Sequence, residues 1–196
     1  MTGKEIKLSR EYHEEIIINA QNKNLSDSKK FKNKMANKSI IKGSSVPDAY
    51  IKTIFGSTNL HEYKSHNLIM FFYPKDNTPG CTIECEDFSR LHNDFLSLNT
   101  QIIGVSKDSL ESHEKFAKKF KLSINLVSDE TQELCLLFDV IKDKNMYGKI
   151  IKGIERSTFF INSNFFLEKS WRGVKAKGHA EQALSVVSSY NRNQLK

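Results

Sequence analysis

A continuous apolar run, NLIMFFYP at residues 67–74, limits the fold of this 196-residue chain more than any other segment. Its length suits a β-strand, and a proline ends it. Because polar residues do not alternate with the apolar ones, both faces of the strand must be covered. The run therefore predicts a central strand of an α/β protein, with helices on either side of the sheet.

Helix and strand patterns alternate after this run. Residues 81–96 form one amphipathic pattern, whose apolar stripe consists of Ile83, Phe88, Leu91, Phe95 and Leu96. Strands are predicted in QIIGVS and NLVS, and helices over Ser109–Phe120 and in DETQELCLLFDV, with Ser128 or Asp129 as N-cap. STFFINS and FFLEKSW predict a hairpin around NSN, and a last helix is expected over His179–Tyr190. The pattern indicates an α/β sandwich of one domain.

Composition and cysteine count narrow the class of protein. The apolar and charged fractions are those of an ordinary soluble protein, no run approaches the ~20 apolar residues that cross a bilayer, and the N-terminus lacks a secretory signal pattern. Three cysteines are an odd number in a chain too large to need crosslinks. We therefore expect a cytoplasmic protein without a membrane partner, whose reduced thiols serve metal or redox chemistry.

The positive charge lies mainly in the N-terminal part of the chain. Residues 1–45 carry ten basic and five acidic residues, whereas residues 46–196 carry twenty and eighteen. We divide the chain into a basic extension at 1–42, a folded domain at 43–191 and a tail at 192–196. The extension joins an amphipathic segment to a Lys/Asn-rich stretch, which predicts a solvated arm. Alternatively its lysines form a patch for nucleic acid or nuclear import, which consists of Lys29, Lys30, Lys32 and Lys34.

Two cysteines four residues apart, Cys81 and Cys85, follow a Pro-Gly pair. A zinc site is not expected, because it needs four nitrogen or sulfur ligands and the third cysteine, Cys135, has no histidine pair near it. A static crosslink also fits badly, since helical residues four apart have Cβ atoms ~5–6 Å apart, whereas a disulfide needs ~3.5–4.5 Å. A reactive thiol is the interpretation that the residues favour.

The position of Cys81 points to reactivity. The residue follows a strand and a loop, so it should lie in the first turn of a helix, where unpaired N–H groups and the helix dipole stabilise an anion. Such a site lowers a thiol pKa and populates the nucleophilic thiolate. The alternative of a small buried cysteine stays open on this evidence.

The loop around Cys81 resembles the active-site signature of one family. Pro74-x-x-x-Thr78-x-x-Cys81 matches that of the peroxiredoxins, and FYPKDNTPGCTIECEDF is similar to their Q-type branch, the bacterioferritin-comigratory proteins. GSSVPDAYI, LVSDE, MYGKIIKGIERSTFFI and WRGVKAKGHAEQAL resemble further family segments in the same order. The resemblance covers about residues 43–190 and leaves the N-terminal extension outside it.

The resemblance implies a thioredoxin-like fold, with a central mixed sheet flanked by helices, and a peroxidase without cofactor or metal. Cys81 would be the peroxidatic cysteine, whose thiolate attacks hydrogen peroxide or an alkyl hydroperoxide and becomes a sulfenic acid. Thr78 would contact thiolate and peroxide, Arg156 would lower the thiol pKa and bind the substrate oxygen, and Pro74 would shield the pocket. Backbone N–H groups of Gly80 and Cys81 would complete the site.

The chain departs from the family at the resolving cysteine. Many Q-type members carry it five residues after the peroxidatic one, where this chain has Glu86, and others carry it near Ala117. Cys85 lies one residue early but on the same helical face as Cys81, so it would serve if that turn unwinds. Alternatively an external thiol resolves the sulfenic acid in a one-Cys mechanism. Cys135 is expected to be a half-buried helix residue without a role in turnover.

The expected function is antioxidant peroxide reduction by a thiol peroxidase that is recycled by thioredoxin or a glutaredoxin-like donor. A monomer is expected rather than a dimer. The alternative class is a nucleic-acid-associated protein, cytoplasmic or nuclear, that keeps the fold and binds through residues 1–42. The histidines and Trp171 suggest no catalytic role.

Overall fold

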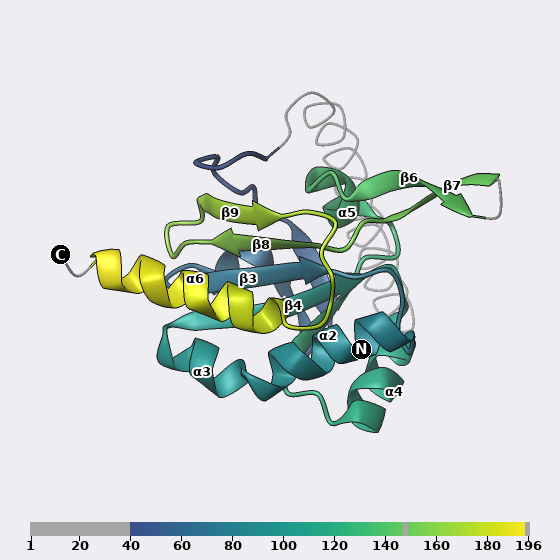
Figure 1. Ribbon diagram of the computed structural model, residues 1–196, viewed down its shortest axis with the longest axis horizontal. Coiled ribbons are helices and arrows are strands. Elements are labelled where there is room, and N and C mark those ends of the chain that lie inside the picture. Colours follow the sequence, from purple (N-terminus) through teal and green to yellow (C-terminus); the bar gives the residue numbers. More distant parts are fainter. Residues whose placement is uncertain (1–39, 147–148, 195–196) are drawn as a thin grey trace, which may run out of the picture. The chain divides into compact units, whose positions relative to one another are not determined.

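The computed structural model describes residues 40–146 and 149–194 (Figure 1). The amphipathic segment and the lysine patch of the N-terminal extension lie outside these residues. No helix of the described part is long and apolar enough to cross a membrane.

The elements alternate along the chain much as the sequence pattern indicates. In order they are β1 (Tyr50–Thr53), β2 (Gly56–Asn59), a 3-10 helix (Leu60–Tyr63), β3 (Asn67–Phe72), α2 (Pro79–Arg90), α3 (His92–Ser97), β4 (Thr100–Ser106), α4 (Leu110–Phe120), β5 (Asn125–Ser128), α5 (Glu133–Leu137), β6 (Ile141–Met146), β7 (Lys149–Ile154), β8 (Ser157–Ile161), β9 (Leu167–Trp171) and α6 (His179–Gln194). The strands in NLIMFFYP, QIIGVS and NLVS, the hairpin around NSN and the helix capped by Ser109 are confirmed.

Seven strands form one sheet in the order β2–β1–β5–β4–β3–β8–β9, and β6 and β7 form a separate antiparallel hairpin. The three strands β3, β4 and β5 pair in parallel, whereas the remaining strands of the sheet join in antiparallel pairs. All six residues of β3 are buried, as expected for a strand covered on both faces. The predicted α/β architecture with a central mixed sheet is confirmed.

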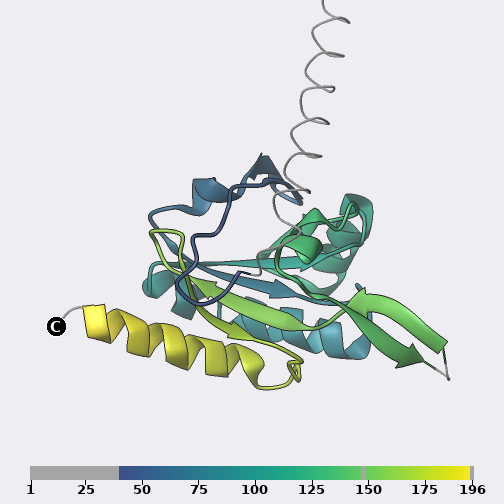
Figure 2. The same ribbon diagram turned by 90° about the horizontal axis from the view of Figure 1, so that it is seen from above.

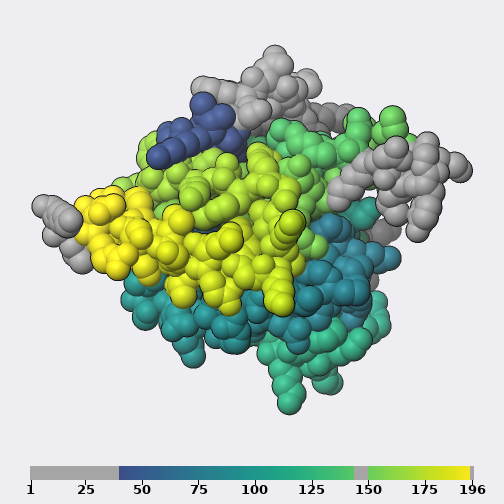
Figure 3. Space-filling view, in the orientation of Figure 1, coloured from purple at the N-terminus to yellow at the C-terminus, as the bar shows by residue number. Residues whose placement is uncertain are grey.

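Helices cover both faces of the sheet. Figure 2 shows α2 and α6 on one side of the sheet and α5 on the other, and in Figure 3 α6 lies across the visible face beside α2 and α3. Phe71 of β3 stacks on Phe88 of α2, with ring centroids 4.5 Å apart. This position of the Phe71 ring requires glycine at position 104 in β4, because a Cβ there would lie 2.7 Å from the ring. The sheet thus positions α2 through aromatic packing.

Two predicted helices differ from those observed. The pattern over residues 81–96 is divided at Leu91 into α2 and α3, and Ile83 and Leu96 are 42% and 40% exposed rather than part of the apolar stripe. The helix expected in DETQELCLLFDV spans only five residues. Its N-cap is Gln132 rather than Ser128 or Asp129. The Asp129 carboxylate nevertheless accepts hydrogen bonds from the N–H groups of Leu134 and Cys135 in this helix.

Two pairs of strands in the structure were not predicted from the sequence. The β1–β2 pair includes GSTN, which has no large apolar residue, and the β6–β7 hairpin includes the charged stretch IKDKNM. Neither segment carries the alternation that marks a half-buried strand. The hairpin projects beyond the main sheet in Figure 1, which explains why its residue pattern is that of a surface element.

Candidate active site

Cys81 is the third residue of α2, directly after the loop that leaves β3. Pro79 begins the helix and Thr78 is its N-cap; proline suits this first position because its missing N–H would be unpaired there. Thr82 donates the first helical hydrogen bond, to the Thr78 carbonyl at 2.9 Å. The N–H groups of Gly80 and Cys81 therefore have no acceptor within the helix, and the predicted position in an anion-stabilising first turn is confirmed.

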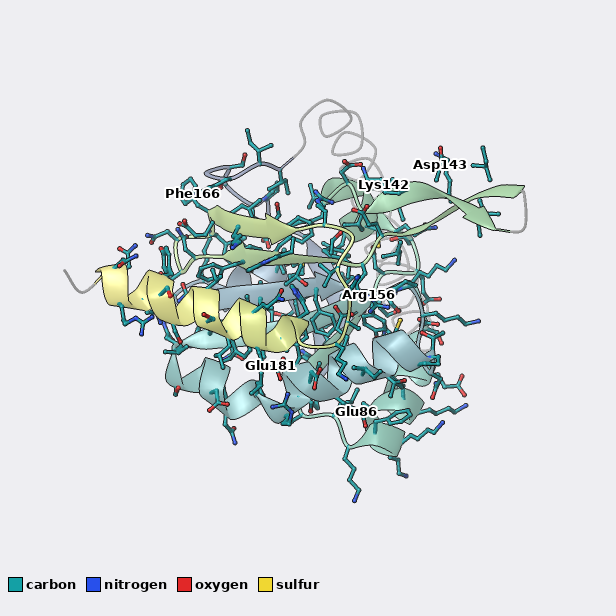
Figure 4. All side chains as sticks on the ribbon, viewed as in Figure 1. Glu86, Lys142, Asp143, Arg156, Phe166 and Glu181 are labelled. Carbon is teal, nitrogen blue, oxygen red and sulfur yellow. The ribbon has the colours of Figure 1, made fainter. Side chains whose placement is uncertain are left out.

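Arg156 brings a fixed positive charge to this thiol. The residue lies between β7 and β8, and its Nη2 donates to Cys81 Sγ at 3.3 Å across 75 residues of sequence. The Val174 N–H holds its backbone through a 2.9 Å hydrogen bond to the Arg156 carbonyl. Gly80 leaves room for the guanidinium, since a Cβ there would lie 3.3 Å from Nη2. Figure 4 shows Arg156 between the start of β8 and α2.

Glu84 holds the other side of the guanidinium and was not predicted from the sequence. Its side chain is fully buried and accepts a short hydrogen bond from Arg156 Nη1 through Oε2. The second oxygen, Oε1, has no hydrogen-bond partner among the described residues. Burial raises the pKa of Glu84 to about 7, although Arg156 opposes the shift. The available signal was an acidic residue three positions after Cys81, on the same helical face.

Stability measured against pH should report on Glu84. Because its folded-state pKa of about 7 exceeds the ordinary 4.5, the folded protein binds more protons than the unfolded chain between these values. The contribution of Glu84 to the free energy of unfolding is complete below the unfolded-state pKa. It is lost as pH rises through about 7, which lowers the free energy of unfolding by about 3 kcal/mol. Urea unfolding at pH 5 and pH 8 should show this loss in the wild type and not in Glu84→Gln. Glu86→Gln, which changes an exposed residue of the same helix, is the control. An equal change in unfolding free energy between pH 5 and pH 8 in wild type and Glu84→Gln would contradict the raised pKa of Glu84.

Thr78 and Pro74 flank the loop that leads to Cys81. The Thr78 hydroxyl donates to the Lys75 carbonyl at 2.9 Å, so in this state it closes the loop. Pro74 is half-buried directly after Tyr73 at the end of β3. The structure thus brings Arg156 onto the Cys81 sulfur, while contacts of Thr78 and Pro74 with thiolate or peroxide stay predictions.

The remaining cysteines occupy different environments. Cys85 is fully buried, one turn after Cys81 in the same core cluster, and burial together with the Glu84 charge raises the pKa of its thiol well above the usual range. Cys135 in α5 is also fully buried, outside that cluster, so the expectation of half-burial is wrong. Burial, and to a smaller extent the charge and hydrogen bond of Asp129, raises the pKa of the Cys135 thiol. All three thiols are free, and the described residues contain no group of three potential ligands suited to a metal ion.

A free thiol at a helix N-terminus, beside a fixed arginine and in the helix that follows a central parallel strand, is typical of reactive cysteines, including those of thiol-based oxidoreductases. The AhpC/TSA family matches residues 42–170. The chain is 46% identical over 133 residues to Peroxiredoxin Bcp of Xanthomonas campestris, covering 68% of this chain and 83% of that protein. It is 45% identical over 146 residues to Peroxiredoxin Bcp of Bacillus subtilis, covering 74% and 93%.

Solved structures agree with these relatives. Xanthomonas campestris peroxiredoxin Q superposes with a TM-score of 0.70 at 43% identity, covering 73% of this chain and 91% of that one. The chain therefore belongs to the AhpC/TSA family and, within it, to the peroxiredoxins of the Bcp or Q type. It is a thiol-dependent peroxidase with the thioredoxin-like fold of that family, and the resemblance seen in the sequence is confirmed.

Proposed function

We propose that this protein reduces hydrogen peroxide and alkyl hydroperoxides through Cys81. The observation that carries the proposal is the 3.3 Å contact between Arg156 Nη2 and Cys81 Sγ, with Glu84 fixing the other side of the guanidinium. A structure of the Xanthomonas campestris bacterioferritin comigratory protein, 42% identical to this chain, is described in terms of alkyl peroxide reduction. This similarity supports the inclusion of alkyl hydroperoxides.

The first step is attack of the Cys81 thiolate on one peroxide oxygen. The O–O bond breaks, Cys81 becomes a sulfenic acid, and the departing hydroxide or alkoxide takes up a proton to leave as water or alcohol. Negative charge moves from sulfur to the departing oxygen during this step. Arg156 and the N–H groups at the start of α2 can stabilise that charge without rearranging, because they are already held in place.

The second step is resolution of the sulfenic acid by Cys85. Its thiol sulfur replaces the sulfenic oxygen, which leaves as water as the disulfide forms. Cys85 is fully buried in the reduced protein, whereas Glu86, at the position where many Q-type proteins carry this cysteine, is exposed. An intact helix also keeps the two Cβ atoms ~1–2 Å too far apart. The first turns of α2 must therefore open before the disulfide can form, and opening of a helix end needs far less free energy than global unfolding.

Disulfide mapping after one equivalent of peroxide tests this step. We expect a bond between Cys81 and Cys85 with a loss of two hydrogens by mass spectrometry, and faster amide exchange across residues 78–90 in the oxidised protein. The Cys135→Ser variant should give the same bond, because Cys135 lies outside the core cluster of the other two thiols. A persistent sulfenic acid would favour resolution by an external thiol, and a bond to Cys135 or between chains would assign the resolving role elsewhere.

Thioredoxin, or a glutaredoxin-like dithiol, is the reductant that this scheme requires. Its first thiolate attacks the Cys81–Cys85 disulfide and its second completes the exchange, which returns both thiols of the peroxidase. If Cys81 remains a sulfenic acid, a single external thiol would instead form a mixed disulfide with it. Comparing turnover with a dithiol donor and with a single-thiol donor, under steady peroxide supply, therefore separates the two-Cys cycle from the one-Cys cycle.

A further inference from the structure

A buried polar cluster lies under the active-site loop and has no part in the chemistry proposed above. It consists of Tyr73, Asp76, Ser112 and His113, and we call it the loop cluster. The Tyr73 hydroxyl donates to Asp76 Oδ1 at 2.8 Å, and the Ser112 hydroxyl donates to Oδ2 at 2.7 Å. His113 Nδ1 donates to the same carboxylate, with 2.9 Å to Oδ2 and 3.1 Å to Oδ1. Both carboxylate oxygens of Asp76 are therefore satisfied.

His113 joins this cluster to β5 of the central sheet. Its ring is fully buried, and Nε2 lies 3.2 Å from the Val127 carbonyl, which can only accept. Because the carboxylate of Asp76 also only accepts, the contact with it needs a proton on Nδ1 of His113. Hydrogen bonds from His113 and Ser112 hold the pKa of Asp76 below its usual range, against the effect of burial. Removing His113 or Ser112 would leave the buried Asp76 carboxylate without one of its hydrogen-bond donors.

The loop cluster ties the active-site loop to two elements of the domain. Asp76 lies within the loop, two residues before the N-cap Thr78, whereas Ser112 and His113 belong to α4 and the Val127 carbonyl to β5. The Asp76 N–H also donates to the Asp108 carboxylate at 3.0 Å. The side chain and the backbone N–H of Asp76 thus both hold the loop, immediately ahead of the helical turn that carries Cys81.

The same cluster borders the Cys85 thiol. Tyr73 belongs to the core cluster that contains both active-site cysteines. Burial and the charges of Glu84 and Cys81 raise the pKa of Cys85, and the charge of Asp76 adds to this effect. A charge on Cys85 would likewise raise the pKa of Tyr73. Tyr73 thus connects the loop cluster to the packed core that buries Cys85.

We propose that the loop cluster is a latch that holds the active-site loop closed in the reduced protein and sets how often α2 opens to release Cys85. Its four members are positioning residues: they act on Cys81 and Cys85 through the loop. A strong latch keeps Cys81 aligned for attack on peroxide, and a weak one lets Cys85 reach the sulfenic acid sooner. The second effect rests on the proposed resolving role of Cys85, whereas the control of Cys85 exposure does not.

Alkylation of single thiols in the reduced protein tests the latch. In the Cys81→Ser background, Tyr73→Phe, Ser112→Ala and His113→Asn should each raise the iodoacetamide reactivity of Cys85, on the order of tenfold for loss of a buried hydrogen bond. Cys135 is equally buried but lies outside the core cluster, so its reactivity reports global opening in the same sample. The latch predicts that the ratio of Cys85 to Cys135 alkylation rises.

A matched control is available at the far end of β3. Asn67 is a buried polar residue whose side chain bonds Asn191 at 3.1 Å and the Ser163 N–H at 3.1 Å, so Asn67→Ala removes a similar network away from the loop. An unchanged alkylation ratio in Tyr73→Phe and Ser112→Ala, or an equal rise in Asn67→Ala, would overturn the latch. Because the assay needs no peroxide, its result stands apart from the disulfide map, which alone decides whether Cys85 resolves Cys81.

With Cys81 present, the latch has a second consequence. The same variants should react more slowly with peroxide yet lose less activity to over-oxidation at high peroxide, because a frequently open α2 shortens the life of the sulfenic acid. A general loss of packing would lower the first rate without protecting against over-oxidation. Greater over-oxidation in Tyr73→Phe than in wild type would contradict the latch.

Discussion

Peroxide consumption coupled to thioredoxin should fall to the background rate in the Cys81→Ser variant, a loss on the order of 10³-fold or more. Serine keeps the size of the side chain and its place beside Arg156, but its hydroxyl does not ionise near neutral pH and cannot carry the sulfenic oxygen. The variant therefore removes the nucleophile with little change in the fold. The measurement is the rate of peroxide loss with thioredoxin in excess, alongside the circular dichroism of both proteins.

Two further cysteine variants make this test specific. Cys135→Ser should retain the wild-type rate, because that thiol lies in α5 outside the core cluster of Cys81 and Cys85. Cys85→Ser should complete one rapid turnover and then stall unless an external thiol is added. Equal peroxide consumption by wild type and Cys81→Ser would remove the proposed role of Cys81 altogether.

Arg156→Ala should lower the second-order rate constant with peroxide by about 10²–10³, the usual effect of removing one preorganised donor to a developing charge. The Arg156 side chain is 15% exposed, and its guanidinium donates to Cys81 Sγ through Nη2 and to Glu84 through Nη1. Arg156→Lys should restore little, because an ammonium group cannot span both partners as the planar guanidinium does. Stopped-flow mixing with hydrogen peroxide measures the rate constant directly.

Arg90→Ala is the matched control for this variant. Arg90 also belongs to the α2 region, but its side chain is exposed and pairs with Asp87 and Glu181 at the surface, where such pairs contribute little to stability. We therefore expect a rate constant close to that of the wild type. A similar loss in both arginine variants would mean that α2 is disturbed in general, and a normal rate in Arg156→Ala would reject the charge-stabilisation mechanism.

Local patterns were sufficient for much of the fold. The apolar run at 67–74, the hairpin around NSN and the helix capped by Ser109 depend on neighbours within a few residues, so sequence periodicity predicts them. The division at Leu91 and the β6–β7 hairpin depend on how segments pack or project, and the residues themselves carry no such signal. The exposure of Ile83 and Leu96 has the same origin, since only the positions of α2 and α3 on the sheet decide which parts of their surfaces are covered.

The active site divides along the same line. The place of Cys81 in a first helical turn, and its spacing from Cys85, follow from the order of residues, and the family resemblance directed attention to Arg156. Tertiary structure alone decided that Arg156 joins Cys81 to a buried Glu84, that Cys85 is sealed in the core, and that His113 meets Asp76 under the loop. The physical reason is that ionisation and burial depend on charges and apolar surfaces brought together from distant parts of the chain, and these the fold creates.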